Sequence, residues 1–232
     1  MKIAVISDIH GNYDALVEVL KKAKKEGVQH LLILGDIVGY YYHPDKILKA
    51  LSEWSFDMIK GNHEYILEDL IANPNLKESI RLKYGSGHKN AIDKLSLEQL
   101  KFLKDLPETR SVQFDKTSLL MSHGSPWLND YYIYPDVHQE IIEKCDSEQH
   151  DFVLIGHSHY QFAVKNTNSI VINPGSVGQS RQAGGKASWC IINTENKCFQ
   201  MLSTAYNVEK LIDEVAKKDS DIKYLTQVLK RN

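Results

Sequence analysis

The chain has 232 residues, with 28 Lys and Arg against 30 Asp and Glu, so its charges nearly cancel and give no reason to expect binding to long nucleic acids or to a membrane surface. Its three cysteines lack CxxC spacing, which argues against a disulfide framework or a thiolate zinc site. No apolar stretch approaches the ~18 residues of a membrane span, and the N-terminal segment becomes polar too early for a signal peptide, so we expect a cytoplasmic protein.

Strands and helices alternate in the first part of the chain. Residues 2–7 (KIAVIS) form an apolar run typical of a buried strand, and residues 12–27 carry apolar side chains at helical spacing before a glycine stop. Residues 30–36 and 56–61 predict two further strands, and residues 43–54 predict the helix between them. This order indicates a layered α/β fold.

The remainder is predicted to be helical first and strand-rich later. Residues 64–107 read as helical, with Ser96 and Gln99 suited to a capping box. The segments 111–114 and 118–124 predict a hairpin, and 135–145 a helix. Strands follow at 151–159, 161–166, 169–176, 187–193 and 197–202. We predict one domain over residues 1–232 with a C-terminal helix from about residue 208. Cys190 and Cys198 face each other across the last hairpin in one arrangement, but free thiols are expected.

Five apolar runs are each followed by Asp, Asn or His. Because α/β proteins place ligands beyond the carboxyl ends of their strands, we expect these side chains to meet at one edge of the sheet. The two-residue spacing within the Asp8 and His10 pair and within the His157 and His159 pair predicts that each pair points one way from an extended segment. The candidate metal ligands are Asp8, His10, Asp36, Asn62, His123, His157 and His159.

Seven ligands are too many for one four-coordinate ion. Two ions about 3.5 to 4 Å apart would use them all, with Asp36 as the natural bridge. A single histidine after a strand is more often a structural residue or a cap. Asp and His are costly at buried strand ends unless paired or metal-bound, however, and a cost repeated five times favours a metal site.

The motifs DIH, GDIVG, GNHE, SHG and GHSH, in this order, resemble the signature of the calcineurin-like metallophosphoesterase superfamily. The resemblance runs from Asp8 to Arg181. It implies a four-layer αββα sandwich of two mixed β-sheets flanked by helices. It also implies that Asp8, His10 and His159 hold one metal, that Asn62, His123 and His157 hold the other, that Asp36 bridges them, and that His63 lies beside the leaving group without binding metal.

The sequence departs from the Ser/Thr protein phosphatases of that superfamily. They continue the second motif as GDxVDRG and place an arginine before GNHE, whereas this chain has GDIVGYYY and Lys60. The acidic partner of the catalytic histidine and two phosphate-binding arginines are therefore missing, and lysine does not replace the bidentate fork of arginine. The same departure argues against diadenosine tetraphosphatases. The compact bacterial and archaeal phosphodiesterase-like branch, with its NPGSVG element, fits better.

Such a site suits phosphoryl transfer. Two divalent cations lower the pKa of a shared water so that the resulting hydroxide attacks the phosphate, and His63 can protonate the departing alkoxide. The family resemblance implies manganese or iron, while zinc, cobalt or nickel also suit oxygen and imidazole ligands. Arg181, just after NPGSVG, is expected to contact the substrate. The alternative for this segment is a glycine-rich turn with a solvent-facing arginine.

We expect a phosphodiesterase or phosphatase acting on a small phosphate ester, with no long nucleic acid and no membrane as partner. One alternative is a nuclease or cyclic-nucleotide phosphodiesterase, and another is a catalytically silent metal-binding scaffold. The aromatic clusters at 40–42 and 131–134 either line the cleft or pack. Solvated or core positions are expected for the histidines outside the motifs, which are His30, His43, His88, His138 and His150.

Overall fold

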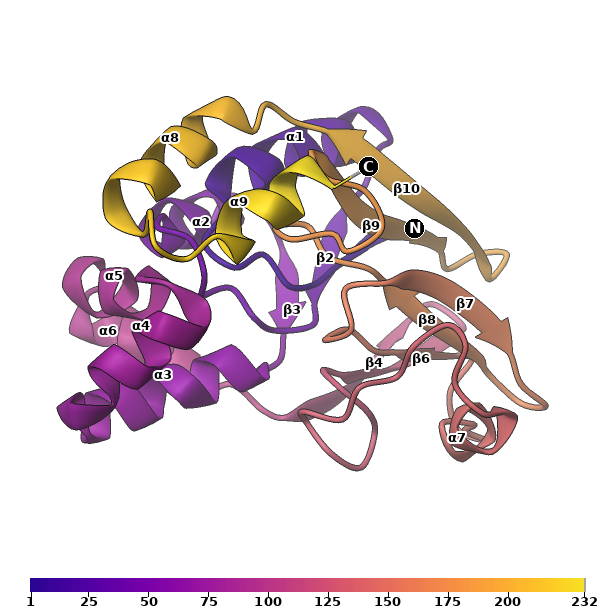
Figure 1. Ribbon diagram of the computed structural model, residues 1–232. Coiled ribbons are helices and arrows are strands. Elements are labelled where there is room, and N and C mark those ends of the chain that lie inside the picture. Colours follow the sequence, from indigo (N-terminus) through magenta and orange to yellow (C-terminus); the bar gives the residue numbers. More distant parts are fainter. Residues whose placement is uncertain (232) are drawn as a thin grey trace.

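The computed structural model describes residues 1–231 and contains two five-stranded sheets that pack face to face (Figure 1). The first sheet has the order β10-β9-β1-β2-β3, in which β1, β2 and β3 are parallel, and β9 runs antiparallel to both β1 and β10. Its strands are β1 (Lys2–Ile6), β2 (His30–Ile33), β3 (Phe56–Met58), β9 (Lys186–Asn193) and β10 (Cys198–Ala205).

The second sheet has the order β4-β5-β6-β8-β7, with β5, β6 and β8 parallel. The hairpin expected at residues 111–124 is present as the antiparallel pair β4 and β5. The strands of this second sheet are β4 (Thr109–Phe114), β5 (Thr117–Ser122), β6 (Phe152–Leu154), β7 (Gln161–Lys165) and β8 (Ile170–Pro174). Both sheets are therefore mixed, as the family resemblance implied.

Helices cover the outer faces of the two sheets. Figure 1 shows α1, α2, α8 and α9 beside the first sheet, α7 beside the second, and α3 to α6 grouped together at the side. The bounds are α1 (Tyr13–Lys25), α2 (Pro44–Leu51), α3 (Asn62–Ala72), α4 (Lys77–Tyr84), α5 (Gly87–Lys94), α6 (Leu97–Lys104), α7 (Gln139–Lys144), α8 (Glu209–Lys218) and α9 (Tyr224–Gln227), with short 3-10 turns at Pro74–Leu76 and Val228–Lys230. No helix among residues 1–231 has the length and apolar character that a membrane crossing requires.

Strand alternation builds the layers. Ile3 and Val5 of β1 belong to the apolar cluster between the two sheets, whereas Ala4 and Ile6 belong to the cluster under the helices. Successive side chains of a strand point to opposite faces, so one strand serves both layers. The result is the predicted αββα sandwich.

Three local expectations need correction. The C-terminal segment forms two helices instead of one, because the chain turns inward at Asp219, which is fully buried between them. The helix expected at 135–145 is shortened to α7. Cys190 and Cys198 do not face each other, since they lie opposite Met201 and Asn193 in the hairpin register, and both are free thiols.

Candidate metal centre

The carboxyl ends of strands from both sheets converge on the predicted ligands. Strands β1, β2 and β3 lead to Asp8, Asp36 and Asn62, while β5 and β6 lead to His123 and His157. Five of the seven candidates have left-handed backbone, with φ between 50° and 63°, namely Asp8, His10, Asp36, His157 and His159. Non-glycine residues rarely adopt this conformation, and its concentration at one place is typical of a functional site.

This backbone geometry corrects one expectation. Asp8 and His10 do not project from an extended segment, because β1 ends at Ile6 and the chain then turns sharply. The turn still brings the pair together, with His10 Nε2 3.7 Å from Asp8 Oδ1. His157 and His159 follow β6 in the same way, and the backbone N–H of His157 donates to Asp8 Oδ2 at 3.1 Å.

The first donor group is formed by Asp8, His10 and His159. The Nε2 atoms of His10 and His159 are 3.1 Å apart, and His159 Nε2 is 3.2 Å from Asp8 Oδ1. Asp8 is fully buried, and its Oδ1 has no hydrogen-bond partner among the residues described. A buried carboxylate oxygen without a donor is costly, and a cation would satisfy it.

The second donor group is formed by Asp36, His123 and His157, which also bring potential ligand atoms within 4.8 Å of one another. His123 Nε2 is 3.3 Å from Asp36 Oδ2 and 3.0 Å from Asn62 Oδ1. Asp36 also reaches toward the first group, since its Oδ2 is 3.7 Å from His10 Nε2. The seven predicted residues therefore lie in two adjoining groups, with Asp36 between them. Their role as ligands stays a prediction.

Hydrogen bonds from the far side of each imidazole fix which nitrogen faces the centre. The Nδ1 atoms of His10, His123 and His159 pair with the carbonyl oxygens of Val38, Leu34 and Gln179 at 3.1, 2.6 and 2.9 Å. These Nδ1 atoms therefore carry the protons, and Nε2 is left as the donor to a metal. His157 is reversed, because its Nε2 pairs with the Asp130 carbonyl oxygen and leaves Nδ1 free.

The buried carboxylates of the centre stay ionised and stabilise positive charge beside them. Burial disfavours the charged form of Asp36, but the neighbouring His123 outweighs burial and holds the pKa of that carboxyl well below its usual value. Burial also disfavours the His123 cation, but Asp36 and Asp8 raise its pKa to about 10. His157 has less support from the carboxylates, and burial lowers its pKa to about 4. Carboxylate, amide and imidazole donors around two ionised carboxyls fit divalent cations such as manganese, iron or zinc.

Glu64, for which the sequence suggested no role in the site, holds the loop that carries Asp36 in place. Its carboxylate accepts hydrogen bonds from the backbone N–H groups of Asp36, Ile37 and Gly61, each at 2.8 Å. Burial and the nearby Asp36 raise the pKa of Glu64 to about 7. A side chain at Gly61 would collide with Asp36 Oδ1, so this motif needs a glycine at the contact. The signal available in the sequence was the Glu three residues after Gly61, a spacing typical of helix N-termini.

His63 lies at the start of α3, and its backbone N–H donates to Asp36 Oδ1 at 2.8 Å. Its ring is fully enclosed by aromatic neighbours, with His10, Tyr84 and Tyr40 at centroid distances of 4.8, 4.8 and 4.9 Å. Burial lowers the pKa of His63 well below its usual value, so the ring is neutral near pH 7.

Arg181 is half-buried, and its guanidinium carbon lies 5.9 Å from the centroid of the Tyr132 ring. Tyr132 in turn contacts the predicted ligand His157, with ring centroids 3.9 Å apart. From the C-terminal segment, Tyr224 donates a hydrogen bond to Gln179 Oε1 at 3.2 Å, two residues before Arg181. Arg181 is therefore half-buried beside Tyr132 and does not extend into solvent from an exposed turn.

The aromatic run at 40–42 divides between the two roles considered. Tyr40 faces the histidines, whereas Tyr41 donates to the Leu225 carbonyl at 2.9 Å and Tyr42 to Asp219 Oδ2 at 2.8 Å. The latter two anchor the C-terminal helices. Lys60 likewise points away from the centre, because its Nζ binds Glu68 Oε1 at 2.7 Å, so it cannot serve as a phosphate-binding arginine would.

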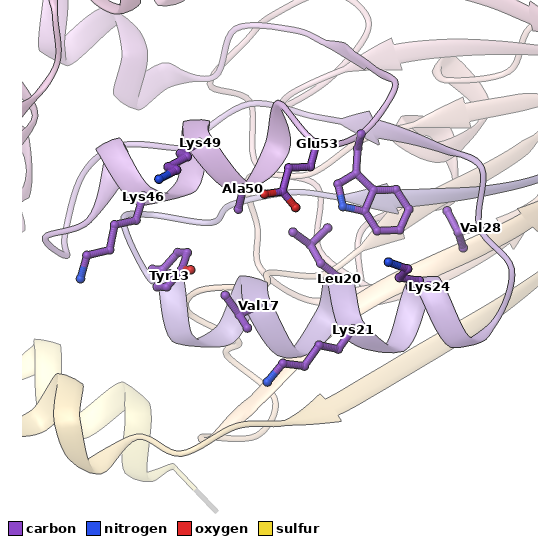
Figure 2. Close-up of a pocket in the computed structure, with 11 residues that line it drawn as sticks. Tyr13, Val17, Leu20, Lys21, Lys24, Val28, Lys46, Lys49, Ala50 and Glu53 are labelled. Carbon is purple, nitrogen blue, oxygen red and sulfur yellow. The ribbon is translucent and has the colours of Figure 1, made fainter.

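A hollow of about 630 Å³ lies elsewhere, between α1 and α2. Figure 2 shows Tyr13, Leu20 and Glu53 among the side chains that line it, together with four lysines. None of its lining residues belongs to the predicted ligand set, so it is not the candidate centre.

A family profile described as "Calcineurin-like phosphoesterase superfamily domain" matches residues 1–197. The chain belongs to the calcineurin-like phosphoesterase superfamily. It is 30% identical to an uncharacterized protein of Methanocaldococcus jannaschii across 93% of this chain and 92% of that one. It is 24% identical to phosphodiesterase YfcE of Escherichia coli K12 across 93% and 98%.

The crystal structure of a hypothetical protein from Pyrococcus horikoshii has a TM-score of 0.84 to this phosphoesterase domain, at 21% identity, covering 99% of this chain and 98% of that one. The comparison confirms the fold. The profile match ends before β10, so the C-terminal helices lie outside the region that defines the superfamily.

Proposed function

We propose that this phosphoesterase is a hydrolase that binds a pair of divalent cations, with manganese or iron as the preferred metals. We also propose that it cleaves small phosphodiesters or phosphomonoesters. The observation that carries the proposal is the position of Asp36 between two buried donor groups. A shared carboxylate between two such groups is the arrangement that a two-cation phosphate site uses. The 24% identity to a protein named phosphodiesterase favours diesters as the first substrates to test.

The roles of the residues follow from their places. Two cations bound at this centre would lower the pKa of a water molecule and neutralise charge on the phosphate. The predicted ligands of both donor groups orient that chemistry at the strand ends. Neutral His63 supplies an N–H to the leaving-group oxygen, and Arg181 holds a non-reacting phosphate oxygen. The enclosing tyrosines exclude water from the histidine.

The test combines metal analysis with turnover. The purified protein, dialysed against manganese and then against metal-free buffer, is expected to retain close to two ions per chain. It should hydrolyse bis-p-nitrophenyl phosphate, and p-nitrophenyl phosphate serves as the monoester comparison. Chelation should abolish both activities, and returning manganese should restore them. A protein that binds two ions but turns over neither ester would support the scaffold alternative and contradict the proposal.

A further inference from the structure

A second histidine touches the one proposed to act on the leaving group. His63 Nδ1 is 3.2 Å from Nε2 of His88, and the two rings are within 9° of parallel with centroids 5.0 Å apart. Their nitrogen edges therefore face each other, as in an N–H···N hydrogen bond. His88 is fully buried, which is the core position that was one of the two expected for it. Its ring also makes this specific contact with His63.

The approach of His88 depends on two glycines. A side chain at Gly39, in the loop after β2, would collide with Nδ1 of His63. Gly87, directly before His88, packs against the backbone of Gly39 and Tyr40 so closely that it has no room for a Cβ atom. The loop and the start of α5 therefore fit together only because both positions lack side chains.

The first turn of α5 is held in place from the C-terminal segment. The buried carboxylate of Asp219 accepts hydrogen bonds from the backbone N–H of Ser86 at 2.9 Å and from its hydroxyl at 2.6 Å. Asn90 then donates to the Ser86 carbonyl at 2.9 Å. His88, between these anchored residues, is fixed in position before any substrate arrives.

The other nitrogen of His88 settles the direction of the hydrogen bond. Its Nδ1 is buried and has no hydrogen-bond partner among the described residues. A proton on Nδ1 would be a buried N–H without an acceptor, which native proteins avoid. We therefore assign the proton to Nε2, which donates to Nδ1 of His63. With Nδ1 acting as acceptor, neutral His63 carries its own proton on Nε2.

We propose that His88 is a positioning residue that donates a hydrogen bond to His63 and fixes the tautomer in which Nε2–H of His63 is available to the leaving-group oxygen. The catalytic part of this inference rests on the proposed function. An acidic partner would accept a hydrogen bond from Nδ1–H and favour the opposite tautomer, in which Nε2 carries no proton. The missing acidic residue of the second motif is therefore replaced by a donor with a different consequence. In this tautomer His63 presents an N–H, and not a lone pair, to the leaving-group oxygen.

The experiment compares His88→Gln with His88→Met. The amide nitrogen of Gln can take the place of Nε2 and keep a donor, whereas Met fills similar space with no N–H. In the manganese-loaded protein, H88M should lower kcat on bis-p-nitrophenyl phosphate about 10- to 100-fold with little change in KM or metal content, and H88Q should recover most of the loss. The loss should be about tenfold larger on diphenyl phosphate, whose leaving group needs a proton more.

A second readout does not depend on turnover. In zinc-loaded protein with ¹⁵N-labelled histidine, long-range ¹H–¹⁵N spectra should show His63 protonated at Nε2 in the wild type and in H88Q, with this preference lost in H88M. A wild-type His63 protonated at Nδ1 would overturn the inference whether or not the variants fold. Equal losses in H88M and H88Q, or losses independent of the leaving group, would also overturn it. If the wild type binds zinc and shows the Nε2–H tautomer but hydrolyses no ester, the proposed function fails while the assigned contact stands.

Discussion

The two sheets contribute different chemistry to the same edge. The first sheet supplies both buried carboxylates, Asp8 and Asp36, together with Asn62 and the His63 proposed to act on the substrate. The predicted site residues that follow strands of the second sheet are neutral or cationic, namely the imidazoles of His123, His157 and His159 and, beyond β8, Arg181. In the proposed site, the carboxylates that follow the first sheet would neutralise the cations, whereas the imidazoles and the arginine that follow the second sheet would complete the ligand set and bind the phosphate.

The largest expected effect comes from the carboxylate side. Asp36→Asn removes the charge shared between the two donor groups, so metal content after dialysis should fall and turnover of bis-p-nitrophenyl phosphate should drop by about 10³-fold or more. Elemental analysis and steady-state rates measure both. Asp57→Asn is the matched control, because Asp57 is on β3 and pairs with His30 at 2.9 Å. Full metal content in D36N would show that Asp36 is not the shared ligand.

His63→Ala tests the other member of the first-sheet half. Because no metal needs this side chain in the proposed arrangement, metal content should stay near the wild-type level while kcat falls about 10²- to 10³-fold. His150→Ala serves as control, because the His150 ring is hydrogen-bonded to Ser111 and Ser147, away from the centre. Loss of one ion in H63A would instead make His63 a ligand, in the group it can form with His10 and Asp36.

On the second-sheet side, His157→Ala should produce a milder and reversible defect. One neutral ligand is lost while both carboxylates remain, so affinity for one ion should weaken about 10- to 100-fold, and excess manganese should restore most of the turnover. Activity titrated against free manganese measures the shift. His138→Ala, at the start of α7, is the control. A defect that no manganese concentration repairs would place His157 in a role other than ligation.

Arg181→Lys examines the cationic end of the same half. Lysine keeps the charge but loses the bidentate fork, so KM for bis-p-nitrophenyl phosphate should rise about tenfold while kcat changes little. Arg110→Lys, whose arginine pairs with Asp57 at 2.9 Å, is the matched control. An unchanged KM would remove Arg181 from the substrate site.

The smallest signal is a proton count. In metal-free protein the pKa of His123 is raised to about 10, whereas that of His157 is lowered to about 4. At pH 8, metal binding should therefore release about one proton, from His123, and affinity should rise about tenfold per pH unit. Calorimetry in buffers of different ionisation enthalpy measures the release.

The stability of the metal-free protein should fall as the pH rises, whereas its metal affinity should increase. Because the folded pKa of His123 exceeds its unfolded value near 6.5, its contribution is fully present below pH about 6.5 and is lost as pH rises through about 10. His123→Asn should abolish both the proton release and this pH dependence. Identical proton release in H123N and wild type would contradict the assignment.

Much of the fold was predictable because apolar runs and strand-end motifs are local signals. The strands before Asp8, Asp36 and Asn62 follow from such runs, and the Ser96 and Gln99 capping box is present with hydrogen bonds of 2.9 and 3.2 Å. Local signals could not show that β9, late in the chain, pairs with β1. The break at Asp219 was missed because a charged residue in a charged segment suggests a solvated helix, whereas here it is fully buried.

The candidate site divides in the same way. The strand-end pattern singles out side chains that the structure brings into two adjoining groups, but the left-handed turns at Asp8 and His10 differ from the extended geometry used to pair them. His88 had no detectable signal, because a partner on a separate helix leaves no spacing in the sequence. Glu64 was visible as a helix-start residue, but the three N–H groups that it binds belong to loops that only the fold assembles.

The Asp219 carboxylate also bears on the order in which the molecule can be completed. During synthesis, residues 61–64 and α5 leave the ribosome long before Asp219 is added. The N–H and hydroxyl of Ser86, before α5, therefore have no Asp219 carboxylate to bind until the C-terminal segment has been made. The contact between His63 and His88 is therefore expected to form only after the C-terminal segment has docked. We therefore expect the centre to be completed late, after synthesis of the chain, even though all seven predicted ligands precede Asp219 in the sequence.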